Sequence, residues 1–491
     1  EITNGILFFI AKNNLPFDLV ESEGFLVLMR KAIPLYKVPS RRTITRLMEE
    51  RYDGLSTLIK EELVKIHDIC LTTDVWTESK NTKSFIALTA HYLINEQHKS
   101  VTIGVEELTD RHTADYLRAL IAQWNIKKES VVAIISDSAP NIKKAIVDSF
   151  GIDKHLPCFE HLLNLVPSKI IENDEIVSPL ITKIKNIVKF FKKSVVAADK
   201  LRLESDLKLI QSVETRWNSC YEMLKRFVEL ADKISVILLL MDSAPEMLVA
   251  TELKIVKEFI QLLEPFYEAT QILSKEKHFT GSKTIPVIKI IKNKLNLLTI
   301  TESGARLKKL LCEEFSKRFE NIEQISILAS ATFLNPRFKK LYFENHLAYS
   351  NMLKKLIRML NSMNESNVHS AREDQTLEIS HSFWSYHETV VNYNKTKQFE
   401  IQDQNEIPED LRYYLHQEVI EMKGNPIAFW NHYSQSTLSK FVKRYLTVIA
   451  TSVPSERLFS RTGNIMVDSR NKLSSLHLQQ LLFLNFSLSI A

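Results

Sequence analysis

The sequence predicts a mixed α/β fold: a mixed sheet with helices packed on it, interrupted by a long all-helical insertion. Three observations carry this prediction. Short β-branched runs separated by polar turns follow one another between residues 65 and 108. Residues 131–137 form a continuous apolar run of strand length, which is typical of a strand buried on both faces. Residues 218–360 are helical in pattern throughout and contain no strand signal.

Residues 66–150 are predicted to form a strand meander followed by alternating helices and strands. The predicted order is β-β-β-α-β-α, which favours a mixed sheet covered by helices. The runs are three strands at 66–77, 84–93 and 100–108, a helix at 113–124, a strand at 131–137 and a helix at 138–150. A fifth strand is predicted at 206–213.

The composition is that of a globular protein with room for two to four packed units in 491 residues. Hydrophobic residues make up 45% and charged residues 25%, both ordinary shares. Only 9 residues are glycine, which argues against glycine-rich phosphate loops and for a helix-rich chain. The net charge of +5 is mild, so it permits nucleic-acid binding through local patches without requiring it.

The four cysteines, Cys70, Cys158, Cys220 and Cys312, are far apart and form no CxxC pair. A disulfide framework or a four-cysteine zinc site is therefore not expected, and an intracellular compartment fits. No apolar run reaches about 18 residues, so no membrane span is expected. The chain starts at Glu1 inside an amphipathic pattern without a signal peptide. We expect it to be part of a longer protein whose N-terminus is missing.

Residues 1–62 are predicted to be helical, with a break at Pro39 and a helix cap at Ser40. The helix that follows begins with Arg41 and Arg42. A basic helix start of this kind is ordinarily a solvated face. The alternative is contact with a phosphate backbone.

Two aspartates are predicted at strand ends: Asp74 at the end of the first strand and Asp137 at the end of the fourth. The first and fourth strands can be sheet neighbours, so the two carboxylates are expected to converge at one edge. One aspartate at a strand end is usually a turn residue. Two at the C-terminal ends of strands in a mixed sheet are a better indication of a site.

The segment 157–172 is predicted to be a helix that carries Cys158 and His161 in CxxH spacing. No second ligand pair is visible, so a structural histidine is favoured over half of a zinc site. Further on, residues 183–193 hold five lysines and no acid. This run is either a solvated face over apolar residues or, through Lys192 and Lys193, a contact with nucleic acid.

Near the C-terminus, residues 450–464 carry a single carboxylate, Glu456, in a run that is otherwise small, basic or apolar. It is predicted in the first turn of a short helix, where a carboxylate is usually just favourable charge. Together with Asp74 and Asp137, however, Glu456 completes the three carboxylates that two hard divalent ions need for in-line phosphoryl chemistry. Sequence distance does not exclude their convergence.

The last predicted helix is apolar on more than one side, so it is expected to be buried. Its apolar side chains either pack into the core around the predicted sheet or form a direct subunit interface. They are Leu476, Leu481, Leu482, Leu484 and Phe486.

Several blocks, in their order along nearly the whole chain, resemble the hAT superfamily of cut-and-paste DNA transposases and their domesticated BED-finger relatives. The blocks are LPFDLVESEGF with PSRRTI, LTTDVWTESKNTKSFIALTAHYL, IISDSAPNIKKAI with CFEHLLNL, ETRWNSCYEMLKR, LLEPFYEAT, ATFLNPRFKK, and LSKFVKRYLTVIATSVPSERLFSRTGNIMVDSRNKL with LLFLNF. Two positions depart from the family pattern: Ser138, where many relatives have Asn, and Asn335, where Asp is common.

The resemblance implies an RNase H-like catalytic core with a DDE triad, interrupted by a large all-helical insertion. By position the triad is Asp74, Asp137 and Glu456, which would bind Mg²⁺ or Mn²⁺ for DNA strand cleavage and transfer. The implied N-terminal helical segment, for DNA binding or dimerisation, covers residues 1–62. The two parts of the core cover residues 63–215 and 436–491. The all-helical insertion between them covers residues 216–435, with a polar linker near 362–410.

The resemblance also implies DNA contacts and partners. Arg216 and Trp217 match the family's RW pair, whose Trp is implicated in stacking on a displaced base. His161 matches the family's CxxH block, where contact with DNA or the scissile phosphate is implied. The expected partners are transposon ends and target DNA, with the protein as at least a homodimer in the nucleus. Zinc is expected only if a BED finger lies upstream.

Two functions remain open from the sequence. The first is an active transposase, in keeping with the intact triad and RW pair. The second is a domesticated nuclear protein that binds DNA and dimerises without transposing, as a transcriptional regulator or a SUMO-ligase-like protein.

Overall fold

The chain forms two compact units, which we call the sheet unit and the helical unit. The sheet unit comprises Glu1–Cys158, Lys277–Gly281 and Asn425–Ala491, and the helical unit comprises Phe159–Glu276 and Ser282–Gly424. A computed structural model describes residues 1–78, 83–108, 113–137, 139–213, 217–275, 280–361, 384, 386–387, 390–391, 407–433, 436–452 and 475–487.

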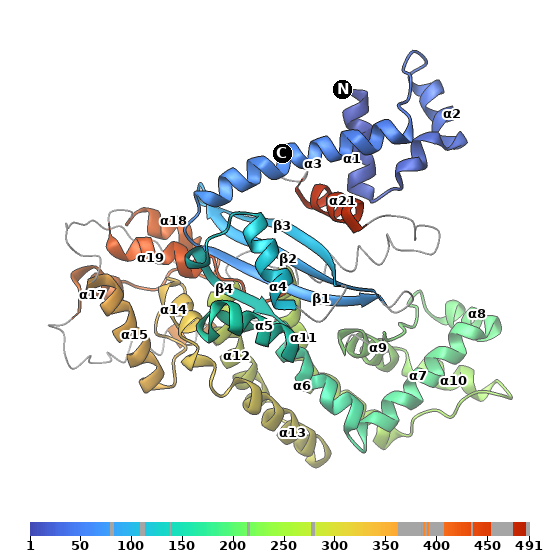
Figure 1. Cartoon of the computed structure of the whole chain (residues 1–491). Helices are drawn as coiled ribbons and strands as arrows, with labels where there is room; N and C mark the ends of the chain where they lie inside the picture. The colour runs from blue at the N-terminus through green and yellow to red at the C-terminus, as the bar shows by residue number, and fades with distance from the viewer. Residues whose placement is uncertain are drawn as a thin grey trace. The chain divides into compact units, whose positions relative to one another are not determined.

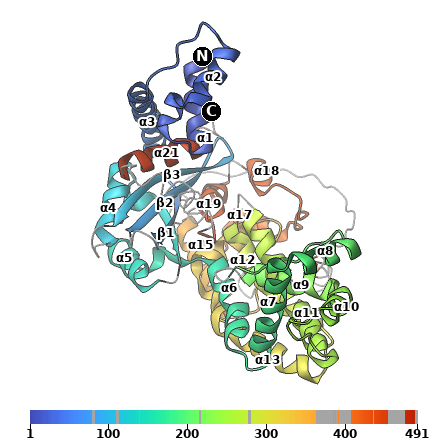
Figure 2. The ribbon, with the colours of Figure 1, turned by 90° about the vertical axis from the view of Figure 1, so that its right-hand side faces the viewer.

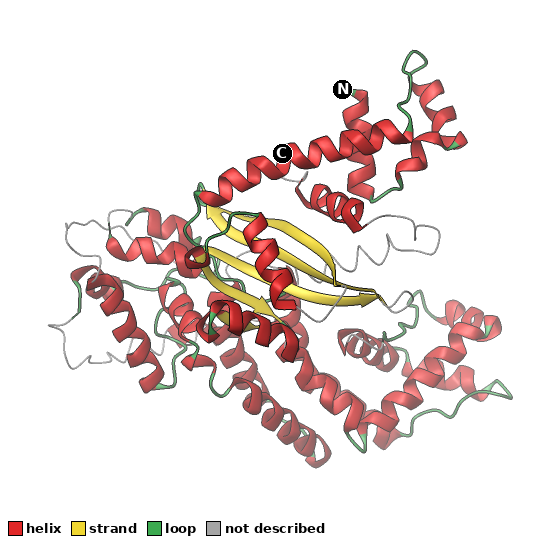
Figure 3. Cartoon of the chain, in the orientation of Figure 1, coloured by secondary structure: helices red, strands yellow, loops and turns green. Residues whose placement is uncertain are grey.

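The sheet unit contains a five-stranded mixed sheet in the order β3-β2-β1-β4-β5 (Figures 1 and 3). β1, β2 and β3 form an antiparallel meander, whereas β4 pairs in parallel with β1 on one side and β5 on the other. The predicted meander and the predicted pairing of the first and fourth strands are thus confirmed. The strands are β1 Ile69–Glu78, β2 Lys83–Ile94, β3 Gln97–Leu108, β4 Val131–Ser136 and β5 His155–Pro157.

Helices cover the sheet because its strands bury apolar side chains on both faces. All six residues of β4 are buried, as the continuous apolar run predicted. The helices α4 and α5 pack side by side on the sheet, and α21 packs on β3 and against α1 and α3 (Figures 1 and 2). The helices of this unit are α1 Ile2–Asn13, η1 Phe17–Glu21, α2 Glu23–Ala32, α3 Arg41–Val64, α4 Thr113–Gln123, η2 Lys128–Ser130, α5 Pro140–Phe150, η3 Ile152–Lys154, α18 Pro426–Asn431, α19 Thr437–Leu446 and α21 Ser475–Ser487.

Two sequence-based predictions about strands are wrong. Residues 206–213 form no strand. They lie in the helical unit, where the described residues offer no sheet edge, and the fifth strand is the three-residue β5. Asp74 is not at the end of its strand but within it, because β1 continues to Glu78 through its antiparallel pairing with β2.

The helical unit contains only helices and loops among its described residues, which confirms the all-helical pattern. It begins at Phe159, earlier than the predicted insertion, because α6 packs with α7, α11 and α13. No helix in the described part of the chain is long and apolar enough to span a bilayer. Its helices are α6 Phe159–Asn173, α7 Val177–Lys193, α8 Val195–Glu204, α9 Trp217–Glu229, α10 Ala231–Leu239, α11 Ala250–Lys275, α12 Thr280–Leu297, α13 Glu302–Phe319, η4 Ile322–Gln324, α14 Ser326–Leu334, α15 His346–Asn361 and α17 Glu409–His416.

A buried lysine joins α17 to the turn after α14. Lys339 is 4% exposed, and its Nζ donates to the carbonyl oxygens of Tyr414 at 2.7 Å and Gln417 at 2.5 Å. The same Nζ lies 4.5 Å from the ring centre of Tyr414. Burial lowers the pKa of Lys339 to about 7, with Lys340 adding to the effect and Glu418 opposing it. A charged amine at this position is therefore costly.

We expect the helical unit to gain stability as the pH rises from 7 to 9. In this window the unfolded chain, in which Lys339 titrates near 10.5, binds a proton that the folded chain has released. The gain from this group is at most about 1.4 kcal/mol per pH unit. Denaturant unfolding at pH 7 and pH 9 measures it, and Lys339→Met should lose it. Lys354→Met, on an exposed part of α15, should keep it.

Candidate active site

The pairing of β1 with β4 relates the two predicted catalytic aspartates. In this parallel pair, Leu71 lies beside Ile134 and Thr72 beside Ile135. Asp74 and Asp137 each follow these last paired positions by two residues. Asp74 is still within β1, whereas Asp137 directly follows β4. Both aspartates are half-buried.

Each of these aspartates accepts a hydrogen bond from a backbone N–H close to it in the sequence. Asp74 Oδ1 accepts from the backbone N–H of Val75 at 3.0 Å, and Asp137 Oδ1 accepts from the N–H of Ala139 at 3.2 Å. The second bond turns the chain from β4 into α5, which begins at Pro140. Each bond orients one carboxylate oxygen through a residue close to it in the sequence.

A histidine that the sequence analysis did not single out lies beside Asp137. His155 begins β5, and its Nε2 is 3.1 Å from the hydroxyl of Ser136. Burial lowers the pKa of His155, as does Lys143, while Asp137 raises it. A neutral ring at neutral pH follows from this balance. No motif signalled His155, because only the pairing of β5 with β4 brings it to Asp137.

The chain returns to this part of the sheet shortly before Glu456. The backbone N–H of Ser452 donates to Cys158 Sγ at 3.3 Å, and the N–H of Cys158 donates to the carbonyl oxygen of Ser136 at 2.7 Å. Ser136 directly precedes Asp137. Glu456 lies outside the described residues, four positions after Ser452.

The described residues contain no group of three or more His, Cys, Asp or Glu side chains placed to hold a metal ion. Asp74, within β1, and Asp137, directly after the neighbouring β4, are predicted ligands, and carboxylate oxygen is the donor that Mg²⁺ prefers. The residue types fit such an ion. The third predicted ligand, Glu456, lies outside the described residues.

The predicted DNA-contacting residues of the helical unit differ in exposure. Trp217, the first residue of α9, is 6% exposed, and its Nε1 donates to Asn164 Oδ1 on α6 at 2.7 Å. Base stacking by Trp217 stays a prediction, and it requires the indole to leave this buried position. His161 is half-buried on α6, and Arg216 lies outside the described residues.

The predicted basic contacts are on the surface. Lys192 and Lys193 are exposed in the last turn of α7, whose other side buries Ile184, Ile187 and Val188. Arg41 and Arg42 are exposed in the first turn of α3, which Ser40 caps by accepting from the N–H of Thr43. All four cations are therefore accessible to a phosphate backbone. This exposure agrees with both predicted alternatives, a solvated helix face and a contact with nucleic acid.

The C-terminal helix α21 is mainly a core element. Leu481, Leu482 and Leu484 are at most 2% exposed and belong to the hydrophobic core around the sheet. Leu476, in contrast, is 57% exposed at the start of the helix, so it takes no part in that core. The side chain of Phe486 lies outside the described part. Core packing thus accounts for the three buried leucines.

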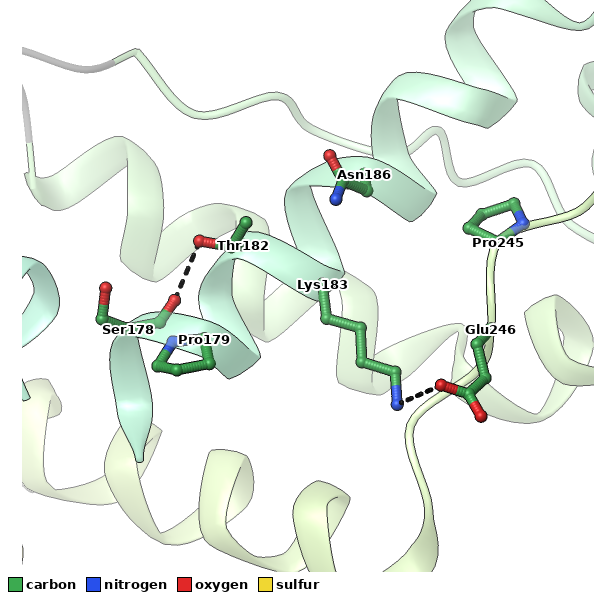
Figure 4. A pocket seen from close by; sticks show the side chains of 7 residues that line it. All are labelled: Ser178, Pro179, Thr182, Lys183, Asn186, Pro245 and Glu246. Carbon is green, nitrogen blue, oxygen red and sulfur yellow. Dashed lines mark hydrogen bonds and ion pairs between the residues drawn. The ribbon is translucent and has the colours of Figure 1, made fainter. Parts of the chain in front are cut away.

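A cavity of about 500 Å³ lies in the helical unit (Figure 4). Asp74 and Asp137, in contrast, belong to the sheet unit. The cavity is lined by α7 and by the loop between α10 and α11. Its lysine, Lys183, is neutralised by Glu246 at 3.4 Å and Glu252 at 3.1 Å. The lining residues are Ser178, Pro179, Thr182, Lys183, Asn186, Pro245 and Glu246.

Two family descriptions match the chain. Residues 410–488 match the hAT family C-terminal dimerisation region, and residues 156–262 match the ZBED1 RNase-like helical domain. The first range contains α17, α18, α19 and α21, together with the segment of Glu456. The second begins at β5 and ends within α11.

Similar proteins include both transposases and BED-finger proteins. The chain is 24% identical to human zinc finger BED domain-containing protein 4, over 100% of this chain and 44% of that protein. It is 23% identical to a putative AC transposase from Zea mays, over 95% of this chain and 62% of that protein. It is 24% identical to the Hobo transposase of Drosophila melanogaster, over 44% of this chain and 35% of that protein. The chain thus spans about half the length of the first two relatives.

Proposed function

We propose that this chain is a metal-dependent DNA transposase of the hAT superfamily with an RNase H-like core, a reading supported by the two family descriptions and by the similarity to transposases. The observation that supports the proposal is the parallel pairing of β1 with β4, because Asp74 and Asp137 each follow the last paired positions, Thr72 and Ile135, by two residues. Carboxylates in such positions would be suitable ligands for hard divalent ions.

The proposed site consists of Asp74, Asp137 and Glu456. Mg²⁺ or Mn²⁺, when bound there, would activate an attacking oxygen and stabilise the leaving oxygen of an in-line displacement. The chain's own part is to orient the carboxylates. A backbone hydrogen bond to Oδ1 contributes to this for each of the two aspartates.

DNA ends and target DNA are the proposed substrates. The exposed Arg41, Arg42, Lys192 and Lys193 would neutralise phosphates, and His161 with the Arg216–Trp217 pair would contact the distorted DNA end. The match to a dimerisation region favours at least a homodimer. A DNA substrate in turn favours the nucleus. Zinc enters only through a BED finger on a longer chain.

A strand-cleavage assay tests the proposal. With Mg²⁺ or Mn²⁺ and DNA carrying the terminal repeats that flank the coding region, we expect the chain to cleave at the repeat ends. Glu456→Gln, which keeps the shape but removes the charge, should abolish cleavage. Equal rates for the two proteins would mean that the triad does not cut DNA.

The second candidate function is DNA binding and dimerisation without cleavage. It is favoured by the match over the whole chain to a human BED-finger protein. The same assay separates the two candidates. Retained repeat binding in a gel-shift experiment, with no cleavage by either protein, supports the second candidate.

A further inference from the structure

A chain of hydrogen bonds runs from β5 to Asp137 through the last residue of β4. His155 Nε2 lies 3.1 Å from the hydroxyl oxygen of Ser136, and this hydroxyl donates to the backbone carbonyl oxygen of Asp137 at 3.0 Å. A hydroxyl has a single proton to donate. Because the proton of Ser136 is directed to Asp137, the Nε2–H of His155 is the donor of the first bond.

The pairing of β4 with β5 brings the side chains of Ser136 and His155 together. In this parallel pair His155 lies beside Ile134, and Pro157 lies beside Ser136. Alternate residues of a strand point to the same face of a sheet, so Ile134, Ser136 and His155 share one face. The backbone of Ser136 is held as well, since its carbonyl oxygen accepts from the N–H of Cys158 at 2.7 Å.

The hydroxyl of Ser136 lies in the interior, where a lost partner is not readily replaced by water. The exposed fraction of Ser136 is 0%, and His155 is half-buried. A buried polar group that loses its partner is costly, so the two bonds of this hydroxyl hold it in one orientation.

Asp137 is the residue at which the chain leaves β4 and turns towards α5. Its carbonyl oxygen accepts from the hydroxyl of Ser136, and its Oδ1 accepts from the N–H of Ala139 at 3.2 Å. The first bond orients the peptide group of Asp137, and the second orients its carboxylate. The direction of the carboxylate therefore depends on the chain of hydrogen bonds that begins at His155.

We propose that Ser136 and His155 are positioning residues that orient the carboxylate of Asp137. This inference rests on the proposed function, in which that carboxylate is a metal ligand. Ser136 holds the peptide group of Asp137, and His155 holds the hydroxyl of Ser136 with its proton towards that group. Neither side chain touches metal or DNA. Loss of residues that orient a metal ligand typically weakens metal binding 10- to 100-fold.

Binding of Mn²⁺ to the purified chain, measured by isothermal titration calorimetry, tests the role of His155 with a matched pair of variants. His155→Leu removes the N–H donor, and we expect Mn²⁺ to bind about tenfold more weakly. His155→Gln presents an amide N–H in place of Nε2–H and should bind Mn²⁺ within about threefold of the wild type. A role of His155 in packing alone predicts that leucine is tolerated at least as well as glutamine.

A second pair of variants tests the hydroxyl of Ser136. Ser136→Ala removes the middle of the chain of hydrogen bonds and should weaken Mn²⁺ binding about tenfold. Ser149→Ala, on α5, is the control. It makes the same chemical change at a hydroxyl that accepts from Arg118 Nη1 at 3.1 Å, so it should bind Mn²⁺ like the wild type.

Amide hydrogen exchange of the metal-free chain, followed by NMR, reports on the same geometry without a metal. The N–H of Ala139 is bonded to Asp137 Oδ1, so it should exchange about fivefold faster in Ser136→Ala and His155→Leu. The N–H of Val75, which is bonded to Asp74 Oδ1, is the internal reference and should exchange as in the wild type.

Three results would contradict the inference. Wild-type affinity for Mn²⁺ in folded Ser136→Ala and His155→Leu would overturn the positioning role and leave the proposed metal site intact. Unchanged exchange at Ala139 in both variants would also overturn the positioning role alone. A wild-type chain that binds Mn²⁺ no more tightly than Asp137→Asn would overturn the proposed metal site itself, and the positioning role with it.

Discussion

Replacing Asp137 by asparagine should lower the rate of Mg²⁺-dependent strand cleavage by about 10³-fold, because one ionised metal ligand is lost while the shape of the side chain is kept. The loss of several kcal/mol of transition-state stabilisation corresponds to such a factor. Folding should be unaffected, since an amide oxygen at position 137 can still accept from the N–H of Ala139. Initial cleavage rates and thermal unfolding curves of the same preparations measure both expectations.

Asp148→Asn is the matched control for this experiment. It makes the same change of charge on the exposed side of α5, in the helix that follows Asp137. Its cleavage rate should equal that of the wild type. A rate within threefold of wild type for Asp137→Asn would remove Asp137 from the site and, with it, the argument from the strand register.

The double variant Leu481→Asp, Leu484→Asp should yield no soluble folded protein. Both side chains are buried against the sheet, with exposed fractions of 2% and 0%. Each change removes a buried leucine and buries a carboxylate, at a cost of at least about 3 kcal/mol. The sum approaches or exceeds the whole stability of a typical domain, about 5–15 kcal/mol. Soluble yield and the far-ultraviolet circular dichroism of any soluble fraction measure the outcome.

Leu476→Asp provides the comparison on the same helix. Leu476 is 57% exposed, so this change should alter the free energy of unfolding by less than about 0.5 kcal/mol. If the double variant were instead a folded monomer by size-exclusion chromatography with light scattering, the two leucines would belong to a subunit interface rather than to the core.

The sheet could be predicted from the sequence where the pattern of side chains is local. β-branched alternation marked the meander, and the uninterrupted apolar run 131–136 marked the buried strand β4. The end of β1 could not be placed in this way. Glu78 belongs to the strand only because it pairs with Lys83 of β2, and pairing partners are not visible in a single strand.

The types of residue in the candidate site could be predicted from the sequence, but the residues that lie around them could not. Asp74 and Asp137 stood out because carboxylates beside strands are chemically distinctive. His155 carries no such signal, since only the pairing of β5 with β4 brings it beside Asp137. The false strand at 206–213 shows the opposite error: a short apolar run has strand character on its own, yet no sheet edge is there to receive it.

The hydrogen bonds of Asn485 have a consequence for how the protein is made. Its Nδ2 donates to the carbonyl oxygens of Ala11 and Lys12, so the end of α1 is completed by a residue that is synthesised more than 470 positions later. α21 also supplies part of the core beside β3. A ribosome at about 5–20 residues per second needs roughly 20 seconds or more to cover that distance. A nascent chain therefore holds both aspartates in an unfinished unit, and a prematurely terminated product should be cleared by proteolysis before it can act on DNA.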